Sequence, residues 1–214
     1  MKTINFLRKG LFLGIMAAAV LVLGLAANMS ISEAGQFAPL EKGTFLYLDT
    51  REVVLNGEGE RVRFVMGKDN VLRMCSPDGK KVFMTFAEKY GDNAGIGYNI
   101  SRLTMKNSNK VFFIINADQG AHGKNAGYWI VGKYKGDWVA FIDLDTLAKY
   151  GYTPNEWHRI GTNVNGAGEY ILTSSHEYMP PGAQFGYERR SAKDFEANLF
   201  WDDQAMWFGI QRTY

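Results

Sequence analysis

Turn-forming residues interrupt this 214-residue chain at short intervals, and the segments between them are rich in Val, Ile, Phe, Tyr and Trp. This alternation is typical of β-hairpins, because Gly, Asn, Asp and Pro suit tight turns while β-branched and aromatic side chains favour strands. Within residues 76–79, Pro77 sets φ for a turn and Gly79 accepts a positive φ. The pattern predicts six strand pairs: 44–55 with 61–66, 71–75 with 81–87, 102–106 with 111–116, 128–134 with 138–143, 158–164 with 170–177, and 199–201 with 205–210.

Six successive hairpins predict an all-β domain built as a single antiparallel meander. Such a meander must close into a barrel or, as the second choice, split into a sandwich, because one face has to be buried. One short helix is predicted after Asp143, over residues 145–150, with an acidic start and a stop at Gly151. Residues 191–198 are a second candidate for one or two helical turns. The longest predicted loops are the first places to expect a ligand, and they cover residues 88–99, 117–127 and 179–190.

Residues 1–34 have the layout of a secretory signal peptide. Basic side chains precede an uncharged apolar run of 17 residues, 11–27, and a polar segment follows it. The small residues Ser32 and Ala34 suit the two specificity positions of the peptidase, so cleavage is expected after Ala34, with Ala26 as an earlier alternative.

The signal predicts that residues 35–214 form a single exported domain, either periplasmic or extracellular. Contact with the membrane is then transient and confined to the signal segment. An uncleaved membrane anchor is the competing interpretation, because 17 apolar residues are at the short edge of what spans a bilayer.

Charge and cysteine content restrict the class of protein further. Removing residues 1–34 takes away three of the 24 Lys and Arg and one of the 22 Asp and Glu, which leaves 21 of each. A neutral domain offers no electrostatic basis for binding nucleic acid or an anionic membrane. Cys75 is the single cysteine of the chain, so no intramolecular disulfide forms, and its place in an apolar segment predicts a buried thiol.

The fourth predicted hairpin carries the candidate ligand-binding residues Trp129, Lys133 and Trp138. Strand periodicity sorts its side chains onto two faces. The predicted core face holds Ile130, Tyr134, Val139 and Phe141, and the other holds Trp129, Val131, Lys133, Lys135, Trp138, Ala140 and Ile142. Two indoles among lysines suit a platform for a sugar ring or an apolar ligand. In the alternative, the lysine stems merely shield the indoles, or another layer of the protein packs on this face.

No metal centre is predicted from the three histidines, His122, His158 and His176. If the fifth hairpin turns around Ala167, His158 and His176 lie directly across from one another. A four-residue turn would instead send them to opposite faces. The spacing matches no recognised zinc site, and no cofactor is predicted.

No catalytic set is predicted either. The hydroxyl of Ser175 adjoins His176, but adjacent residues of a strand point to opposite faces. The Gly-rich segment 118–127 departs from the phosphate-binding loop pattern, because it lacks the early Gly and does not open a helix. We therefore expect an exported, non-enzymatic protein that binds a small ligand, a glycan or a protein partner. The alternatives are a secreted hydrolase whose acids and histidines the fold brings together, and a structural envelope component.

Overall fold

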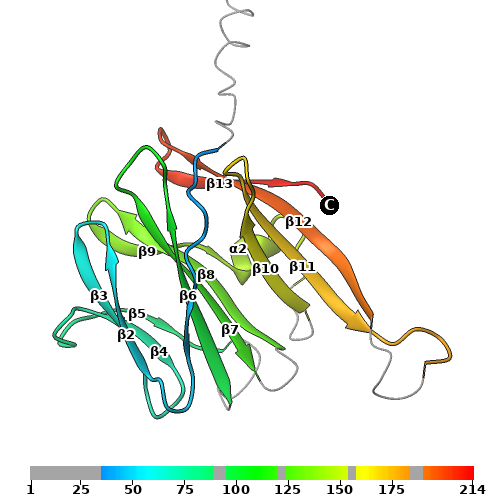
Figure 1. Cartoon of the computed structure of the whole chain (residues 1–214), viewed down its shortest axis with the longest axis horizontal. Coiled ribbons are helices and arrows are strands. Elements are labelled where there is room, and N and C mark those ends of the chain that lie inside the picture. Colours follow the sequence, from blue (N-terminus) through cyan, green and yellow to red (C-terminus); the bar gives the residue numbers. More distant parts are fainter. Residues whose placement is uncertain (1–34, 89–94, 120–123, 154–157, 184–189) are drawn as a thin grey trace, which may run out of the picture. The chain divides into compact units, whose positions relative to one another are not determined.

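The strands of this protein form three antiparallel sheets. The structure is a computed structural model that describes residues 35–88, 95–119, 124–153, 158–183 and 190–214 (Figure 1). The N-terminal sheet holds, in order, β2 (Glu52–Gly57), β3 (Glu60–Met66), β4 (Leu72–Cys75) and β5 (Val82–Phe86). The central sheet holds β1 (Thr44–Leu46), β6 (Ile96–Thr104), β7 (Val111–Gln119), β8 (Lys124–Tyr134) and β9 (Asp137–Asp143). The C-terminal sheet holds β10 (His158–Val164), β11 (Tyr170–Tyr178), β12 (Arg190–Asp202) and β13 (Trp207–Arg212).

The central sheet is buried on both of its faces. Phe112 and Ile114 of β7 belong to a core shared with the C-terminal sheet. Phe113 and Ile115 point the other way, into a second core shared with the N-terminal sheet. Residues 111–115 are therefore all buried, because a strand covered on both sides needs no polar face.

All six predicted hairpins occur as antiparallel pairs, and the prediction of an all-β fold is confirmed. The pairs are β2–β3, β4–β5, β6–β7, β8–β9, β10–β11 and β12–β13. The single meander is wrong, because the chain changes sheet three times: after β1, after β5, when it returns to the central sheet, and after β9. The described strands form no closed barrel, so a sandwich-like arrangement fits.

Two local predictions are wrong. The predicted strand 44–55 is divided by a turn between Tyr47 and Thr50, so that β1 pairs with β6 and β2 pairs with β3. Residues 191–198 are part of β12 and not helical. Their side chains alternate between partly exposed and buried positions, and Phe195 is the first of the buried ones that face the central sheet.

The helix predicted after Asp143 is confirmed as α2 (Leu144–Ala148). Asp143 is its N-cap, since Oδ1 accepts a 2.7 Å hydrogen bond from the Thr146 amide, whereas Asp145 lies in the first turn. In the described part of the chain, no helix is long and apolar enough to cross a membrane. Cys75 is buried, as predicted, and burial raises the pKa of its thiol.

Candidate functional site

The predicted platform does not face open solvent, because the N-terminal sheet packs against it. Trp129 meets Phe86 of β5 edge-on with ring centroids 5.3 Å apart, and the ring centroid of Trp138 lies 6.4 Å from that of Phe83, also in β5. Trp129 and Trp138 are both partly buried against the core between the two sheets. The alternative in which another layer packs on this face therefore describes these indoles, and their contact with a ligand stays a prediction.

Lys133 and Trp138 share one carboxylate of the N-terminal sheet. The Lys133 ammonium lies 2.8 Å from Glu60 Oε1, which also accepts a 2.9 Å hydrogen bond from Trp138 Nε1. The hydrogen bond from Lys133 is the main reason that the pKa of Glu60 is lowered. These polar groups join the central sheet to the N-terminal sheet.

One residue of this hairpin departs from the predicted sorting. Pairing shifts by one residue between Ile130 and Val131, so that Ile130 pairs with Ile142 and Val131 with Ala140. Ile142 consequently joins Ile130 in the core shared with the C-terminal sheet, instead of lying on the face of Trp138.

The histidines form no described metal centre. His158 and His176 are register partners, as the turn around Ala167 predicts. His176 Nδ1 lies 3.0 Å from Asp194 Oδ2, and His122 lies outside the described residues. The parts of the chain that the structure describes contain no group of three or more His, Cys, Asp or Glu arranged to hold a metal ion.

The three predicted loops are shorter than the sequence suggested. Strands β6, β7 and β8 extend into the first two of them, since β6 begins at Ile96 and β7 ends at Gln119. Residues 89–94, 120–123 and 184–189 lie outside the described residues, and the expectation of a ligand there stays a prediction.

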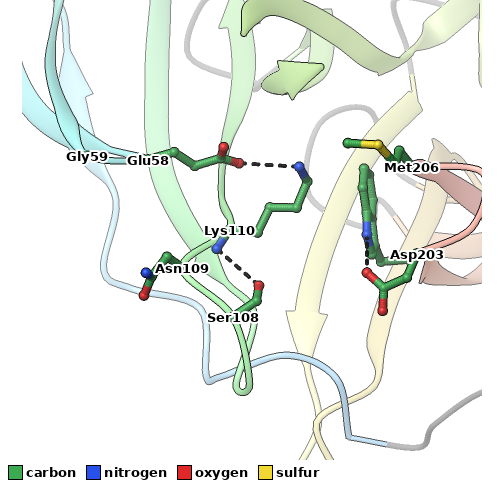
Figure 2. Close-up of a pocket in the computed structure, with 8 residues that line it drawn as sticks. Glu58, Gly59, Ser108, Asn109, Lys110, Asp203 and Met206 are labelled. Atoms are coloured by element: carbon green, nitrogen blue, oxygen red, sulfur yellow. Dashed lines mark hydrogen bonds and ion pairs between the residues drawn. The ribbon is translucent and has the colours of Figure 1, made fainter. Parts of the chain in front are cut away.

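An open cleft of about 540 Å³ lies where one hairpin turn from each sheet meets the other two (Figure 2). The β2–β3 turn, the β6–β7 turn and the β12–β13 turn supply its walls. We call it the hairpin cleft, and its lining residues are Glu58, Gly59, Ser108, Asn109, Lys110, Trp201, Asp203 and Met206.

Lys110 is held at the centre of the cleft by three groups. Its ammonium lies 3.5 Å from Glu58 Oε1 and donates a 3.3 Å hydrogen bond to the Lys133 carbonyl. It also lies 4.7 Å from the ring centroid of Trp201, within the range of a cation–π contact. The amine is therefore a fixed positive charge between the β2–β3 turn and β12.

The opposite wall carries a second carboxylate. Asp203 Oδ1 accepts a 2.9 Å hydrogen bond from Trp201 Nε1, and the other oxygen of Asp203 points away from the indole (Figure 2). Trp201 itself is only 3% exposed, so it supports the cleft without presenting an open ring face. Met206 is 36% exposed and supplies apolar surface.

The cleft can bind through hydrogen bonds, charge and one apolar contact. Its residues lie in three of the predicted turns or next to them, but no local pattern indicates that these turns meet. Comparisons with protein-family models, with curated proteins and with solved structures each find no match for this chain.

Proposed function

We propose that this protein is exported and that it binds a polar ligand, such as a neutral glycan, in the hairpin cleft without acting on it as an enzyme. The observation that carries the proposal is the cleft itself. Its volume of about 540 Å³ is that of a small-ligand site. Short turns that end paired strands hold its polar groups, so little ordering is required when a ligand binds.

The charges of the cleft indicate the kind of ligand. The carboxylates of Glu58 and Asp203 outnumber the ammonium of Lys110, so an acidic ligand is disfavoured and a neutral or amino-bearing one is favoured. Ser108 and Asn109 add a hydroxyl and an amide at the rim (Figure 2). Hydroxyl-rich molecules match this mixture of donors and acceptors.

The same groups argue against catalysis in the cleft. Lys110 is engaged by Glu58 and by the Trp201 ring, and the Oγ atom of Ser108 accepts a hydrogen bond from the Lys110 amide. A serine nucleophile needs a base within hydrogen-bond reach, and the lining residues include no histidine.

Binding of soluble oligosaccharides tests the proposal. A panel of neutral, amino and acidic sugars is applied to the protein, and dissociation constants are measured by calorimetry. We expect a neutral or amino sugar to bind, and Asn109→Ala and Asp203→Asn to weaken binding about tenfold each. Asn163→Ala and Asp137→Asn, at exposed positions outside the cleft, serve as controls. Binding that the two cleft variants leave unchanged would place the ligand elsewhere, and turnover of the sugar would favour the hydrolase.

Export is tested separately by N-terminal sequencing of the protein made in a bacterial host. The compact unit begins at Gly35, directly after the proposed cleavage position. Gln36 then bonds both the amide and the carbonyl of Trp201 at 2.9 Å. We expect Gly35 as the first residue, or Ala27 if the earlier position is used. Intact Met1 on membrane-bound protein would contradict cleavage.

A further inference from the structure

A second group of polar side chains lies between the central and C-terminal sheets. Lys110, in the hairpin cleft, directly precedes β7, and Asn116 and Asp118 lie towards the other end of that strand. Asn125 of β8 and Ser174 of β11 complete the group. We call these four residues, Asn116, Asp118, Asn125 and Ser174, the interlayer cluster.

Contacts across the gap show that the cluster lies between the sheets. Asn116 Nδ2 donates a 3.1 Å hydrogen bond to the Ile160 carbonyl of β10, and Ile160 is the register partner of Ser174. Asn125 is the register partner of Asp118. Its Nδ2 donates a 2.8 Å hydrogen bond to Tyr152 Oη.

Aromatic packing connects the cluster to β12. The Tyr152 ring meets Phe195 edge-on with centroids 5.8 Å apart, and Phe195 is the β12 register partner of Ser174. Strands β7, β8 and β11 therefore carry the cluster, and residues of β10 and β12 adjoin it.

Three oxygen atoms of the cluster are buried without a hydrogen-bond partner among the described residues. They are Asn116 Oδ1, Asn125 Oδ1 and Ser174 Oγ. Asn125 and Ser174 are each only 1% exposed. Buried polar atoms of native proteins are nearly always satisfied, because leaving one unpaired costs stability.

Asp118 adds a carboxylate to this set. Burial raises its pKa to about 6, and the positive charge of Arg159 opposes the shift only in part. The Arg159 guanidinium is itself paired with Glu177 at 2.7 Å. The cluster thus combines one carboxylate with three buried oxygen atoms that have no hydrogen-bond partner among the described residues.

We propose that the interlayer cluster binds a hard cation of the calcium type, with Asn116 Oδ1, Asp118, Asn125 Oδ1 and Ser174 Oγ as its oxygen ligands. Calcium takes carboxylate, amide carbonyl and water oxygens with flexible geometry. An anion would be repelled by Asp118, and a soft metal would require sulfur or imidazole ligands. One carboxylate gives a weak site, in the range of dissociation constants of about 10⁻⁴ to 10⁻³ M found in extracellular modules.

Thermal denaturation of the full-length protein tests the proposal. The protein is treated with EDTA, dialysed, and melted with calcium, magnesium, sodium or ammonium chloride at matched ionic strength. Binding at the stated affinity should raise Tm by about 3 to 10 °C in 10 mM calcium chloride. The absence of a rise would overturn the proposal and assign the oxygens to water. A rise with ammonium but not with calcium would overturn it in favour of an amine.

Two variants with matched controls assign the effect to the cluster. Asp118→Asn and Ser174→Ala should each remove at least half of the calcium-induced rise. Asp137→Asn and Ser191→Ala, at exposed positions, should leave it unchanged. In EDTA, Ser174→Ala should melt no lower than the parent, because it removes a hydroxyl without a partner, so this variant carries the test even if Asp118→Asn does not fold. A calcium-induced rise that both variants retain would overturn the proposal.

Discussion

Replacement of Trp138 by Ala tests whether the fourth hairpin is a packed layer or an open platform. The indole packs against the rings of Phe113, at 5.6 Å, and Phe83, at 6.4 Å. Its Nε1 donates to Glu60, and the Lys133 ammonium lies 5.4 Å from the ring centroid. Truncation therefore removes contacts with the N-terminal sheet and leaves a cavity at that interface.

The size of the loss follows from the burial of the side chain. Large-to-Ala changes at Trp cost about 3 to 5 kcal/mol in a core, and Trp138 is only partly buried. We expect a loss near the lower limit, about 3 kcal/mol. For a folded unit of this size, 1 kcal/mol lowers Tm by about 2 to 4 °C, so Tm should fall by about 6 to 12 °C.

Urea and thermal denaturation followed by far-UV circular dichroism measure the effect. Tyr150→Ala is the control, since that side chain is 42% exposed and should cost less than about 0.5 kcal/mol. A loss at Trp138 as small as that of the control would refute the packed arrangement. It would restore the platform formed by Trp129, Lys133 and Trp138.

Three further predictions concern the N-terminal sheet. Gly57→Ala should destabilise the protein by about 1 to 3 kcal/mol in urea unfolding, because a Cβ atom there would lie 2.7 Å from Cη2 of Trp138. The loss of stability should be smaller in the Trp138→Ala background. Equal losses in both backgrounds would contradict the contact. A thiol probe should label Cys75 slowly in the native protein and rapidly in denaturant, because the buried thiol has a raised pKa. Equal labelling rates in the two conditions would show that β4 opens in the native protein. The Arg73 hydrogen bond lowers the pKa of Asp69 to about 2, so its contribution to stability is complete above the ordinary pKa of 3.8 and is lost as pH falls towards 2. Unfolding between pH 2 and pH 5 should therefore be less pH-dependent in Asp69→Asn.

Hairpins were predictable because turn chemistry is local. Gly79 has a φ of +73°, which a residue without a Cβ accepts readily, and the strands on either side of that turn pair as the sequence indicates. Which hairpins share a sheet depends instead on which strand faces must be buried, and the residues of a single hairpin do not indicate this. The apolar run 111–115 was the available signal, since a strand with one solvent face alternates.

The strand over residues 191–198 was missed for a related reason. Lys193 and Glu196 favour helix by intrinsic propensity, whereas the buried side chains Phe195, Ala197 and Leu199 recur at every second residue, as in a strand. Pairing with β11 along the whole segment, and with β13 from Ala197 onward, decides the conformation. These partners lie outside the window in which propensity acts, so tertiary context overrides it.

The hairpin cleft could not be predicted because its parts are far apart in the chain. Lys110 and Trp201 belong to different sheets, and their contact exists only after the C-terminal sheet has packed on the central one. Each turn was predictable by itself, and its polar residues are typical of any solvent-exposed turn. Nothing local distinguishes a turn that faces solvent from one that faces two other turns.

The interlayer cluster, by contrast, corresponds to a recognisable pattern in the sequence of β7. Five apolar residues are followed by Asn116, Ala117 and Asp118 within the same strand. In a strand covered on both faces, an amide and a carboxylate that lie on one face must meet either partners or a ligand, since their desolvation is costly. A polar interruption near the end of a doubly buried strand is therefore a signal for a site between layers. This pattern can be interpreted only when the strand is known to lie in the central sheet, which is covered on both faces.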